Sequence, residues 1–184
     1  MPSLTLPEAA TFIRKGEVIA TPTEAVYGLS ADPRQLDAVQ KALTLKQRDP
    51  AKGLILVAAD VSQLMAWVDW THCTPQQYAA ILARWPGPVT WVVPAKSNVS
   101  PLIRGQFDTI AVRVTAHPIM RALCEACGHA LISTSANVSG ERPAKTIADI
   151  IQQFGSSLPI LEGALGLSAQ PTEIIDAMSG HQLR

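Results

Sequence analysis

The sequence predicts an α/β fold: a single domain in which helices flank a twisted, mixed sheet. Two observations support this class. Apolar segments typical of buried strands alternate with segments of helical spacing, and no repeat or low-complexity tract interrupts them. The 184 residues are enough for one domain with a sizeable core. We therefore expect one domain over residues 1–184.

The chain opens with a helix and a buried strand. Residues 7–15 have the apolar spacing of a helix, and Gly16 is suited to cap its C-terminus. A strand is expected at residues 18–20. Pro22 then ends strand pairing and stiffens the exit, because proline lacks an N–H and fixes φ.

Polar side chains follow this strand at once. Thr21, Thr23 and Glu24 place two hydroxyls and a carboxylate at the strand end, and residues 27–28 are expected to turn the chain. Ligands of open α/β sheets bind at such strand ends. A proline-stiffened turn without a ligand would have the same sequence, so these residues alone leave both interpretations open.

The later elements alternate in the same way. Helical spacing and capping residues predict helices at 33–46, 62–68, 75–82, 118–127 and 147–154, with Asp32, Thr74 and Thr146 as N-caps. Apolar runs or strict alternation predict strands at 54–59, 89–93, 110–115, 130–133, 158–161 and 173–176. A rigid Trp-Pro-Gly-Pro turn leads into the strand at 89–93.

Composition argues against several classes of protein. The 15 Lys and Arg balance the 15 Asp and Glu, so no overall charge points to nucleic acid or a membrane surface. No apolar run is long enough to span a bilayer, no signal segment opens the chain, and we expect a soluble, cytoplasmic protein.

The three cysteines include Cys124 and Cys127, spaced Cys-x-x-Cys late in a predicted helix, and we expect reduced thiols without a redox or zinc role.

A cluster of cations ends the helix predicted at 33–46. The chain has no Walker A, Gly-x-Gly-x-x-Gly, Gly-x-Ser-x-Gly or His-Glu-x-x-His motif, so a nucleotide site would need another device. Four cations, Lys41, Lys46, Arg48 and Lys52, lie close together. If the chain leaves the helix in extended form, Lys46 and Arg48 point the same way. They either complement the helix macrodipole or clamp a polyphosphate.

A second strand end with hydroxyl groups follows the strand predicted at 130–133. The stretch Ser133-Thr134-Ser135-Ala136-Asn137 is similar to the first polar strand end, and both could face one cleft. Hydrogen bonds from side chain to backbone could equally make it a purely structural turn.

Arg113 favours a cleft. It lies within a predicted strand between apolar residues, where a guanidinium is costly to bury unless it is paired or lines a polar cavity. Glu24, Asp108 and Thr109 are available partners.

Five short blocks together resemble a known family. They are Pro22-Thr23-Glu24-x-Val26-Tyr27-Gly28-Leu29, Lys46-x-Arg48, Trp85-Pro86-Gly87-Pro88-x-Thr90, Asp108-Thr109-x-x-Val112-Arg113 and Ser135-Ala136-Asn137-x-Ser139-Gly140. Their order is that of the YrdC/Sua5/TsaC family of threonylcarbamoyl-AMP synthases, which the chain resembles over nearly its whole length. Its length and its Lys52-Gly53-Leu54 sequence are most similar to the short bacterial branch.

The resemblance implies a fold, a reaction and partners. The fold is a YrdC-like twisted sheet with a basic concave cleft. The reaction joins L-threonine, bicarbonate and ATP into L-threonylcarbamoyladenylate and pyrophosphate, for modification of the tRNA adenosine beside the anticodon. Mg²⁺ is implied with ATP. Transferase proteins would receive the product, and tRNA is a further candidate partner.

The resemblance also implies site residues by position. Threonine would be held by Thr23, Arg113, Ser133 and Thr172. The nucleotide and its phosphates would be held by Lys46, Arg48, Thr109, Ser135, Asn137 and Arg184, with Lys46 and Arg48 also neutralising charge during the reaction. No metal ligand and no general base are expected from the protein.

The chain departs from the family pattern at three places. Longer members have Asn-Pro-Leu-x-x-His at residues 52–57, so a histidine contact to threonine is absent here. Thr134 replaces a frequent proline, and Thr172-Glu173 replaces Ser-Thr.

Two other functional classes remain open. A double-stranded RNA or tRNA-binding module without catalysis would use the basic concave surface, but the zero net charge and few aromatics argue against it. A small-molecule sensor would need the cleft but not the phosphate clamp. Pyrophosphate release that requires ATP, threonine and bicarbonate together distinguishes the three classes.

Overall fold

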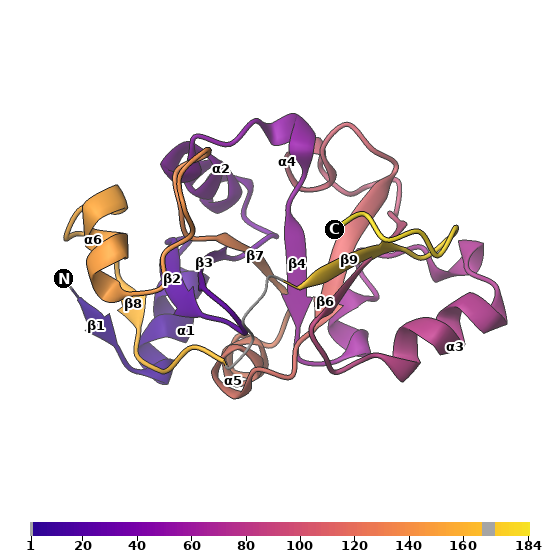
Figure 1. The fold of residues 1–184 in the computed structure, drawn as a ribbon, viewed down its shortest axis with the longest axis horizontal. Coiled ribbons are helices and arrows are strands. Elements are labelled where there is room, and N and C mark those ends of the chain that lie inside the picture. The colour runs from indigo at the N-terminus through magenta and orange to yellow at the C-terminus, as the bar shows by residue number, and fades with distance from the viewer. Residues whose placement is uncertain (1, 167–171) are drawn as a thin grey trace.

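The computed structural model describes residues 2–166 and 172–184, and Figure 1 shows their helices arranged around one sheet. Within these residues, the strands form a mixed sheet in the order β1-β8-β2-β3-β7-β4-β6-β5-β9. The strands are β1 (Ser3–Leu4), β2 (Ile19–Pro22), β3 (Tyr27–Ala31), β4 (Ile55–Ala58), β5 (Val89–Pro94), β6 (Thr109–Val114), β7 (Leu131–Ser135), β8 (Ile160–Leu161) and β9 (Glu173–Asp176). The helices are α1 (Leu6–Arg14), α2 (Leu36–Lys46), α3 (Pro75–Ala83), α4 (Pro101–Arg104), α5 (Pro118–Cys127) and α6 (Ile147–Phe154). Single 3-10 turns lie at Pro50–Lys52, Val61–Leu64 and Trp70–His72.

Strand pairing brings distant parts of the chain together at the middle of the sheet. β3 is antiparallel to β2 and to β7, with Gly28 opposite Ser135. β4 is antiparallel to β7 and parallel to β6, which places Ile55 beside Ser133 and Ala111. Four separate segments of the chain therefore lie on consecutive strands of the sheet, β3, β7, β4 and β6.

Apolar side chains pack on both faces of the sheet. A large cluster on one face includes Leu56 and Val112 and receives residues of α2, α3, α4 and α6. A smaller cluster on the other face includes Val57 and Leu131 and is covered by α1 and α5. Side chains alternate along a strand, so Ile55 shares the face of Val57. Ile55 lines a pocket on the part of this face that α1 and α5 leave open.

The predicted fold class is confirmed, but the predicted turn at residues 27–28 is wrong. These residues begin β3, which is buried along its whole length. The chain turns earlier, where both the backbone N–H and the hydroxyl of Thr23 donate to the carbonyl of Val26, at 3.2 and 2.6 Å. This turn pairs β3 with β2, and the sheet on both sides fixes the conformation of a sequence that contains Gly and Ser.

The predicted start of the helix at residues 33–46 is also wrong. Thr74 and Thr146 form the expected capping boxes, but α2 begins at Leu36 with Gln35 as its N-cap. The buried carboxylate of Asp32 accepts instead from the backbone N–H and the guanidinium of Arg34, at 2.9 and 2.8 Å. Asp32 thus stabilises the turn that precedes the helix.

Three short elements differ from the predictions. The helix predicted at 62–68 is only a 3-10 turn, Val61–Leu64, and neither β1 nor α4 was indicated by periodicity. These elements have four residues or fewer, too few for an apolar pattern to repeat. Their conformation is set by the sheet edge or the segments they pack on.

The cysteines fit the expectation of unreactive thiols. All three are free, and Cys124 is fully buried on α5. Burial raises the pKa of the Cys127 thiol to about 11 and raises that of Cys124 further. No helix among the described residues has the length and hydropathy needed to cross a membrane.

Gly105 is expected to be essential for joining α4 to the turn at Pro50–Lys52. An added Cβ at Gly105 would clash with the carbonyl of Ala51 and lie 2.6 Å from the N of Gly53. Gly155 has a similar positive φ, 78° against 74°, but a Cβ there meets nothing within 4 Å. We predict that Gly155→Ala costs about 1–2 kcal/mol through backbone strain, and that Gly105→Ala costs at least about 1 kcal/mol more. Urea unfolding of both variants measures the difference, and equal losses would contradict the close approach.

Candidate functional site

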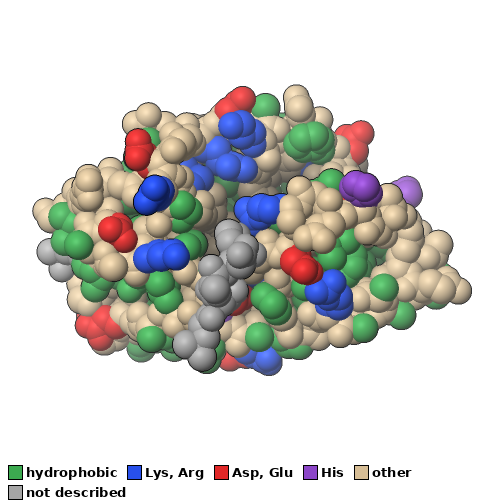
Figure 2. Space-filling view, in the orientation of Figure 1, with side chains coloured by type: hydrophobic (Ala, Val, Ile, Leu, Met, Phe, Trp, Pro, Cys, Tyr) green, Lys and Arg blue, Asp and Glu red, His purple; other side chains and the backbone are tan. Residues whose placement is uncertain are grey.

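The pocket on the open part of the sheet face holds about 510 Å³. Strands β3, β4, β6, β7 and β9 and the segments next to them supply its walls. Figure 2 shows Lys and Arg side chains gathered around a hollow on this face. The cations of its lining are Arg48, Lys52, Arg104, Arg113 and Arg184, and no described lining residue is acidic. The pocket therefore suits an anionic ligand.

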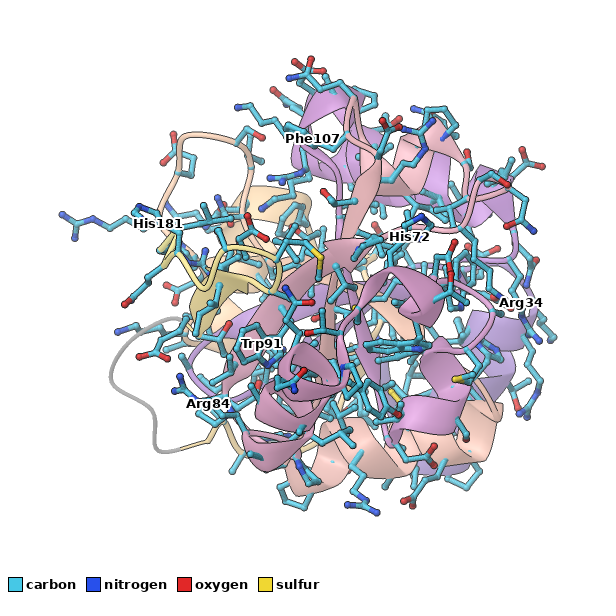
Figure 3. The ribbon with its side chains drawn as sticks, turned by 90° about the vertical axis from the view of Figure 1, so that its right-hand side faces the viewer. Arg34, His72, Arg84, Trp91, Phe107 and His181 are labelled. Carbon is cyan, nitrogen blue, oxygen red and sulfur yellow. The ribbon has the colours of Figure 1, made fainter. Side chains whose placement is uncertain are left out.

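Apolar side chains complete the pocket. Val26, Leu54, Ile55, Val92 and Ile174 are among them. Two further lining residues, Phe107 and Leu183, are 48% and 58% exposed, and Phe107 lies in the upper part of the view in Figure 3. An exposed apolar rim beside a cationic interior suits a ligand with both an apolar ring and anionic groups.

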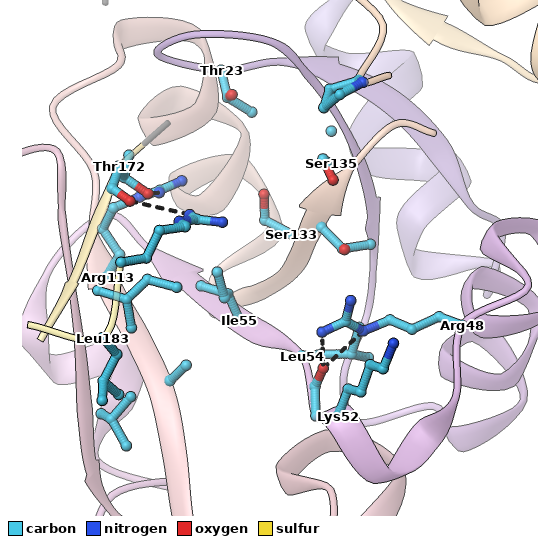
Figure 4. Close-up of a pocket in the computed structure, with 18 of the residues that line it drawn as sticks. Thr23, Arg48, Lys52, Leu54, Ile55, Arg113, Ser133, Ser135, Thr172 and Leu183 are labelled. Carbon is cyan, nitrogen blue, oxygen red and sulfur yellow. Dashed lines mark hydrogen bonds between the residues drawn. The ribbon is translucent and has the colours of Figure 1, made fainter. Parts of the chain in front are cut away.

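Arg113 on β6 is a candidate anion site at one end of the pocket. Its side chain is only 6% exposed. Nη1 donates to the hydroxyl of Thr172 at 2.9 Å (Figure 4), and Nη2 lies 3.3 Å from Oε2 of Glu24. Burial lowers the pKa of Arg113, and the nearby Glu24 carboxylate opposes that shift. Of the partners considered from sequence, Glu24 is the one found, whereas Asp108 lies beside Arg104 instead.

Three hydroxyls near Arg113 have different capacities for a ligand. Thr23 donates its proton to the Val26 carbonyl, so its oxygen can only accept from a ligand. Thr172 accepts from Arg113, so its proton remains available to donate. Ser133 makes no side-chain hydrogen bond to the described residues and can do both. Together they suit a ligand that carries an amine and a hydroxyl beside its carboxylate.

Arg48, Lys52 and Arg104 form a cationic group elsewhere on the pocket wall. Arg48 is anchored because its Nε and Nη2 donate to the carbonyl of Gly53, at 3.0 and 2.8 Å (Figure 4). Arg104 donates from Nε to Val99 at 3.2 Å and from Nη1 to the carbonyl of Phe107. This leaves N–H groups of both guanidiniums, and the Lys52 ammonium, able to meet the oxygens of a polyphosphate.

Lys46 does not reach the pocket wall. Gln47 adopts a left-handed conformation with φ of 50°, so the exit from α2 is not extended and the expectation that Lys46 and Arg48 point the same way is wrong. The Lys46 ammonium donates to the carbonyl of Ser135 at 2.6 Å and to the carbonyl and side-chain oxygens of Asn137 at 3.1 and 2.8 Å. Lys46 therefore stabilises the turn that follows β7.

The pocket brings together most of the residues expected from sequence. Those that line it are Thr23, Arg48, Thr109, Arg113, Ser133, Ser135, Thr172 and Arg184. Lys46 and Asn137 lie behind Ser135, and the side-chain amide of Asn137 donates to the carbonyls of Val138 and Glu141.

Sequence reasoning included Lys52 in the cation cluster without naming it as a site residue, and it assigned no role to Arg104. The available signal is the pair Lys52-Gly53 and Arg104-Gly105, in which each cation precedes a glycine. Those glycines allow the two segments to touch and bring both cations to one wall.

Comparisons with known proteins identify relatives of this chain. A family model described as Sua5_yciO_yrdC, telomere recombination, matches residues 11–184. The chain is 51% identical over 178 residues to the threonylcarbamoyl-AMP synthase of Idiomarina loihiensis, covering 96% of each chain. It is 49% identical over 168 residues to the threonylcarbamoyl-AMP synthase of Serratia proteamaculans, covering 91% of this chain and 89% of that one. The crystal structure of P. abyssi Sua5 complexed with L-threonine superposes with a TM-score of 0.85 at 30% identity, over 95% of this chain and 53% of that longer one.

Lys46 is expected to make the stability of the protein depend on pH. Burial lowers the pKa of Lys46 from 10.5 to about 8, so between these values the unfolded chain binds more protons than the folded one. The Lys46 contribution to the free energy of unfolding should therefore rise with pH over this window, by at most about 1.4 kcal/mol per unit. We predict that Lys46→Met is less stable than wild type at pH 7, because it leaves buried acceptors unpaired, and that the gap widens towards pH 10. Urea unfolding at four pH values measures the gap, and a constant gap would contradict the prediction.

Proposed function

The chain belongs to the Sua5/YciO/YrdC family and has the activity of a threonylcarbamoyl-AMP synthase, and we propose that its pocket joins L-threonine, bicarbonate and ATP into L-threonylcarbamoyladenylate and pyrophosphate. One observation carries the proposal. The pocket has a carboxylate site at Arg113 and a separate cationic group at Arg48, Lys52 and Arg104, with Ile55 and Ser133 between them (Figure 4). A reaction between an amino acid and a nucleoside triphosphate needs this combination.

Threonine binds at the Arg113 end. Its carboxylate pairs with the guanidinium, and Thr172 can add an O–H donor. The amine donates to Thr23, whose oxygen can only accept. An N–H held in this way leaves the nitrogen lone pair free for the carbon of bicarbonate or carbon dioxide. The structure of P. abyssi Sua5 is a complex with L-threonine, which supports an amino-acid site in this fold.

The reaction proceeds through a carbamate. Attack of the threonine nitrogen on carbon dioxide forms an N–C bond and releases an amine proton. Attack on bicarbonate forms the same bond, and the amine proton leaves with the hydroxyl group as water. A carbamate oxygen then attacks the α-phosphorus of ATP in line, and the bond to pyrophosphate breaks. Because such a carbamate decomposes readily in water, the site acts by holding both partners together and excluding water.

The cationic group neutralises the phosphates. Arg48, Lys52 and Arg104 meet the triphosphate and stabilise the charge that develops on pyrophosphate. Thr109, Ser135 and Arg184 supply further polar contacts to the nucleotide. Lys46 and Asn137 act indirectly, by holding the turn that presents Ser135.

Mg²⁺ enters as a part of the MgATP substrate. The described lining residues offer no carboxylate, and the described chain has no group of three or more His, Cys, Asp or Glu that could hold a metal. These residues do not fit a metal held by the protein. Phosphate oxygens are the usual ligands of Mg²⁺ in such substrates.

The product serves tRNA modification in the cytoplasm, where ATP is available and free thiols persist. The adenylate is passed to transferase proteins that act on the adenosine beside the anticodon. Binding of tRNA at the cations of the pocket is the remaining candidate contact, and it would be salt-sensitive.

Pyrophosphate release tests the proposed reaction. We expect release from ATP only when L-threonine and bicarbonate are both present, because the phosphorus is attacked by the carbamate and not by water. Omission of each substrate in turn is the control. Release that persists without threonine, or a folded preparation that releases none, would contradict the synthase and favour an RNA-binding module or a sensor.

Arg48→Ala tests whether the cationic group binds the triphosphate. We predict that this change weakens ATP binding about tenfold or more, because it removes a fixed guanidinium from the triphosphate. Lys41→Ala is the matched control, since Lys41 belongs to the same cation cluster but bonds Gly16 and Glu17 outside the pocket. Isothermal titration calorimetry with MgATP measures both. If both variants bind MgATP with equal affinity, Arg48 has only a structural role at the Gly53 turn.

A further inference from the structure

A buried carboxylate lies directly behind the anion site. Glu24 follows β2, and its side chain is 11% exposed. It does not line the pocket, but its Oε2 lies 3.3 Å from Nη2 of Arg113. Arg113 therefore stands between Glu24 and the place where a substrate carboxylate would bind.

The position of Glu24 is fixed from two sides. Its Oε1 accepts from the hydroxyl of Thr115 at 2.6 Å, and the same Thr115 oxygen accepts from the backbone N–H of His117 at 3.0 Å. The backbone of Glu24 is covered by Gly166, where an added Cβ would lie 2.6 Å from the Glu24 carbonyl oxygen. Glu24 thus has little freedom to follow a moving guanidinium.

The hydrogen bonding of the Glu24–Arg113 pair is incomplete. Oε2 of Glu24 and Nε of Arg113 are both buried, and neither has a hydrogen-bond partner among the described residues. Buried groups of this kind usually make hydrogen bonds, and leaving them without one is costly. The guanidinium therefore keeps N–H groups that a second carboxylate can take.

We propose that Glu24 is a positioning residue, whose fixed carboxylate sets the orientation in which Arg113 receives the carboxylate of threonine. The inference rests on the proposed function. Glu24 already balances the charge of Arg113 before substrate binds, so it adds little to the attraction for threonine. A wrongly turned guanidinium would instead misplace the threonine amine relative to the bicarbonate carbon, and such misplacement lowers the rate of reaction more than binding.

The substitution Glu24→Gln tests the proposal. Its amide puts an N–H donor against the guanidinium, which repels Arg113 from its present orientation while leaving it a full positive charge for threonine. We expect kcat to fall about tenfold or more and KM for threonine to stay within about threefold. Thr115→Val, which removes the hydroxyl that holds Glu24, should lower kcat in the same way, and Thr115→Ser should retain it. Glu17→Gln, at an exposed glutamate paired with Lys41, is the control.

The outcomes separate the two proposals. Kinetics are measured by pyrophosphate release, with circular dichroism and urea unfolding to show that each variant is folded. If the wild type releases no pyrophosphate, the proposed function fails. If the wild type is active and folded Glu24→Gln has an unchanged kcat, or only a raised KM, the positioning role is overturned. If Glu24→Gln does not fold, the Thr115 pair decides: equal kcat for Thr115→Val and Thr115→Ser overturns the proposal.

Discussion

The burial of one guanidinium in the middle of the sheet constrains much of the site. Arg113 lies on β6 with its side chain 6% exposed, and such a charge is tolerated only where oxygens surround it. The oxygens come from Glu24 after β2 and from Thr172 before β9, segments that lie far apart along the chain. The need to satisfy Arg113 thus links the first turn of the sheet to its last strand, and an anionic ligand can complete the arrangement.

The cationic group of Arg48, Lys52 and Arg104 depends on close contact between two backbone segments. Arg48 is held by the carbonyl of Gly53, and Arg104 is the last residue of the four-residue helix α4, which packs on the same turn. Two glycines at this junction leave no room for a Cβ, which brings the two segments within contact distance. The cationic group is therefore assembled by tertiary packing, whereas the Arg113 site is assembled by strand pairing.

The parts of the fold that the sequence predicts well are those with a repeated apolar pattern, such as β5, β6 and α5. The prediction fails at β3, where Gly28 and Ser30 resemble turn residues and only pairing with β2 and β7 makes a strand. At the site, the cost of burying a charge was enough to single out Arg113, but it left Glu24, Asp108 and Thr109 as possible partners, and only the structure identifies Glu24. The expected common direction of Lys46 and Arg48 was wrong because nothing in the sequence indicates that Gln47 would adopt a left-handed conformation. Arg104 was missed because its helix is too short to show periodicity.

The absence of acidic residues from the described pocket lining also affects the end of the reaction. Arg48, Lys52 and Arg104 attract phosphate oxygens whether or not these are still joined to the adenylate, because fixed positive charges do not distinguish a bound triphosphate from a detached pyrophosphate. In the proposed reaction, the detached pyrophosphate is thus held by the same three cations that stabilise its developing charge. Net flow towards the adenylate then relies on low pyrophosphate around the enzyme, which ties its direction to the hydrolysis of pyrophosphate elsewhere in the cell.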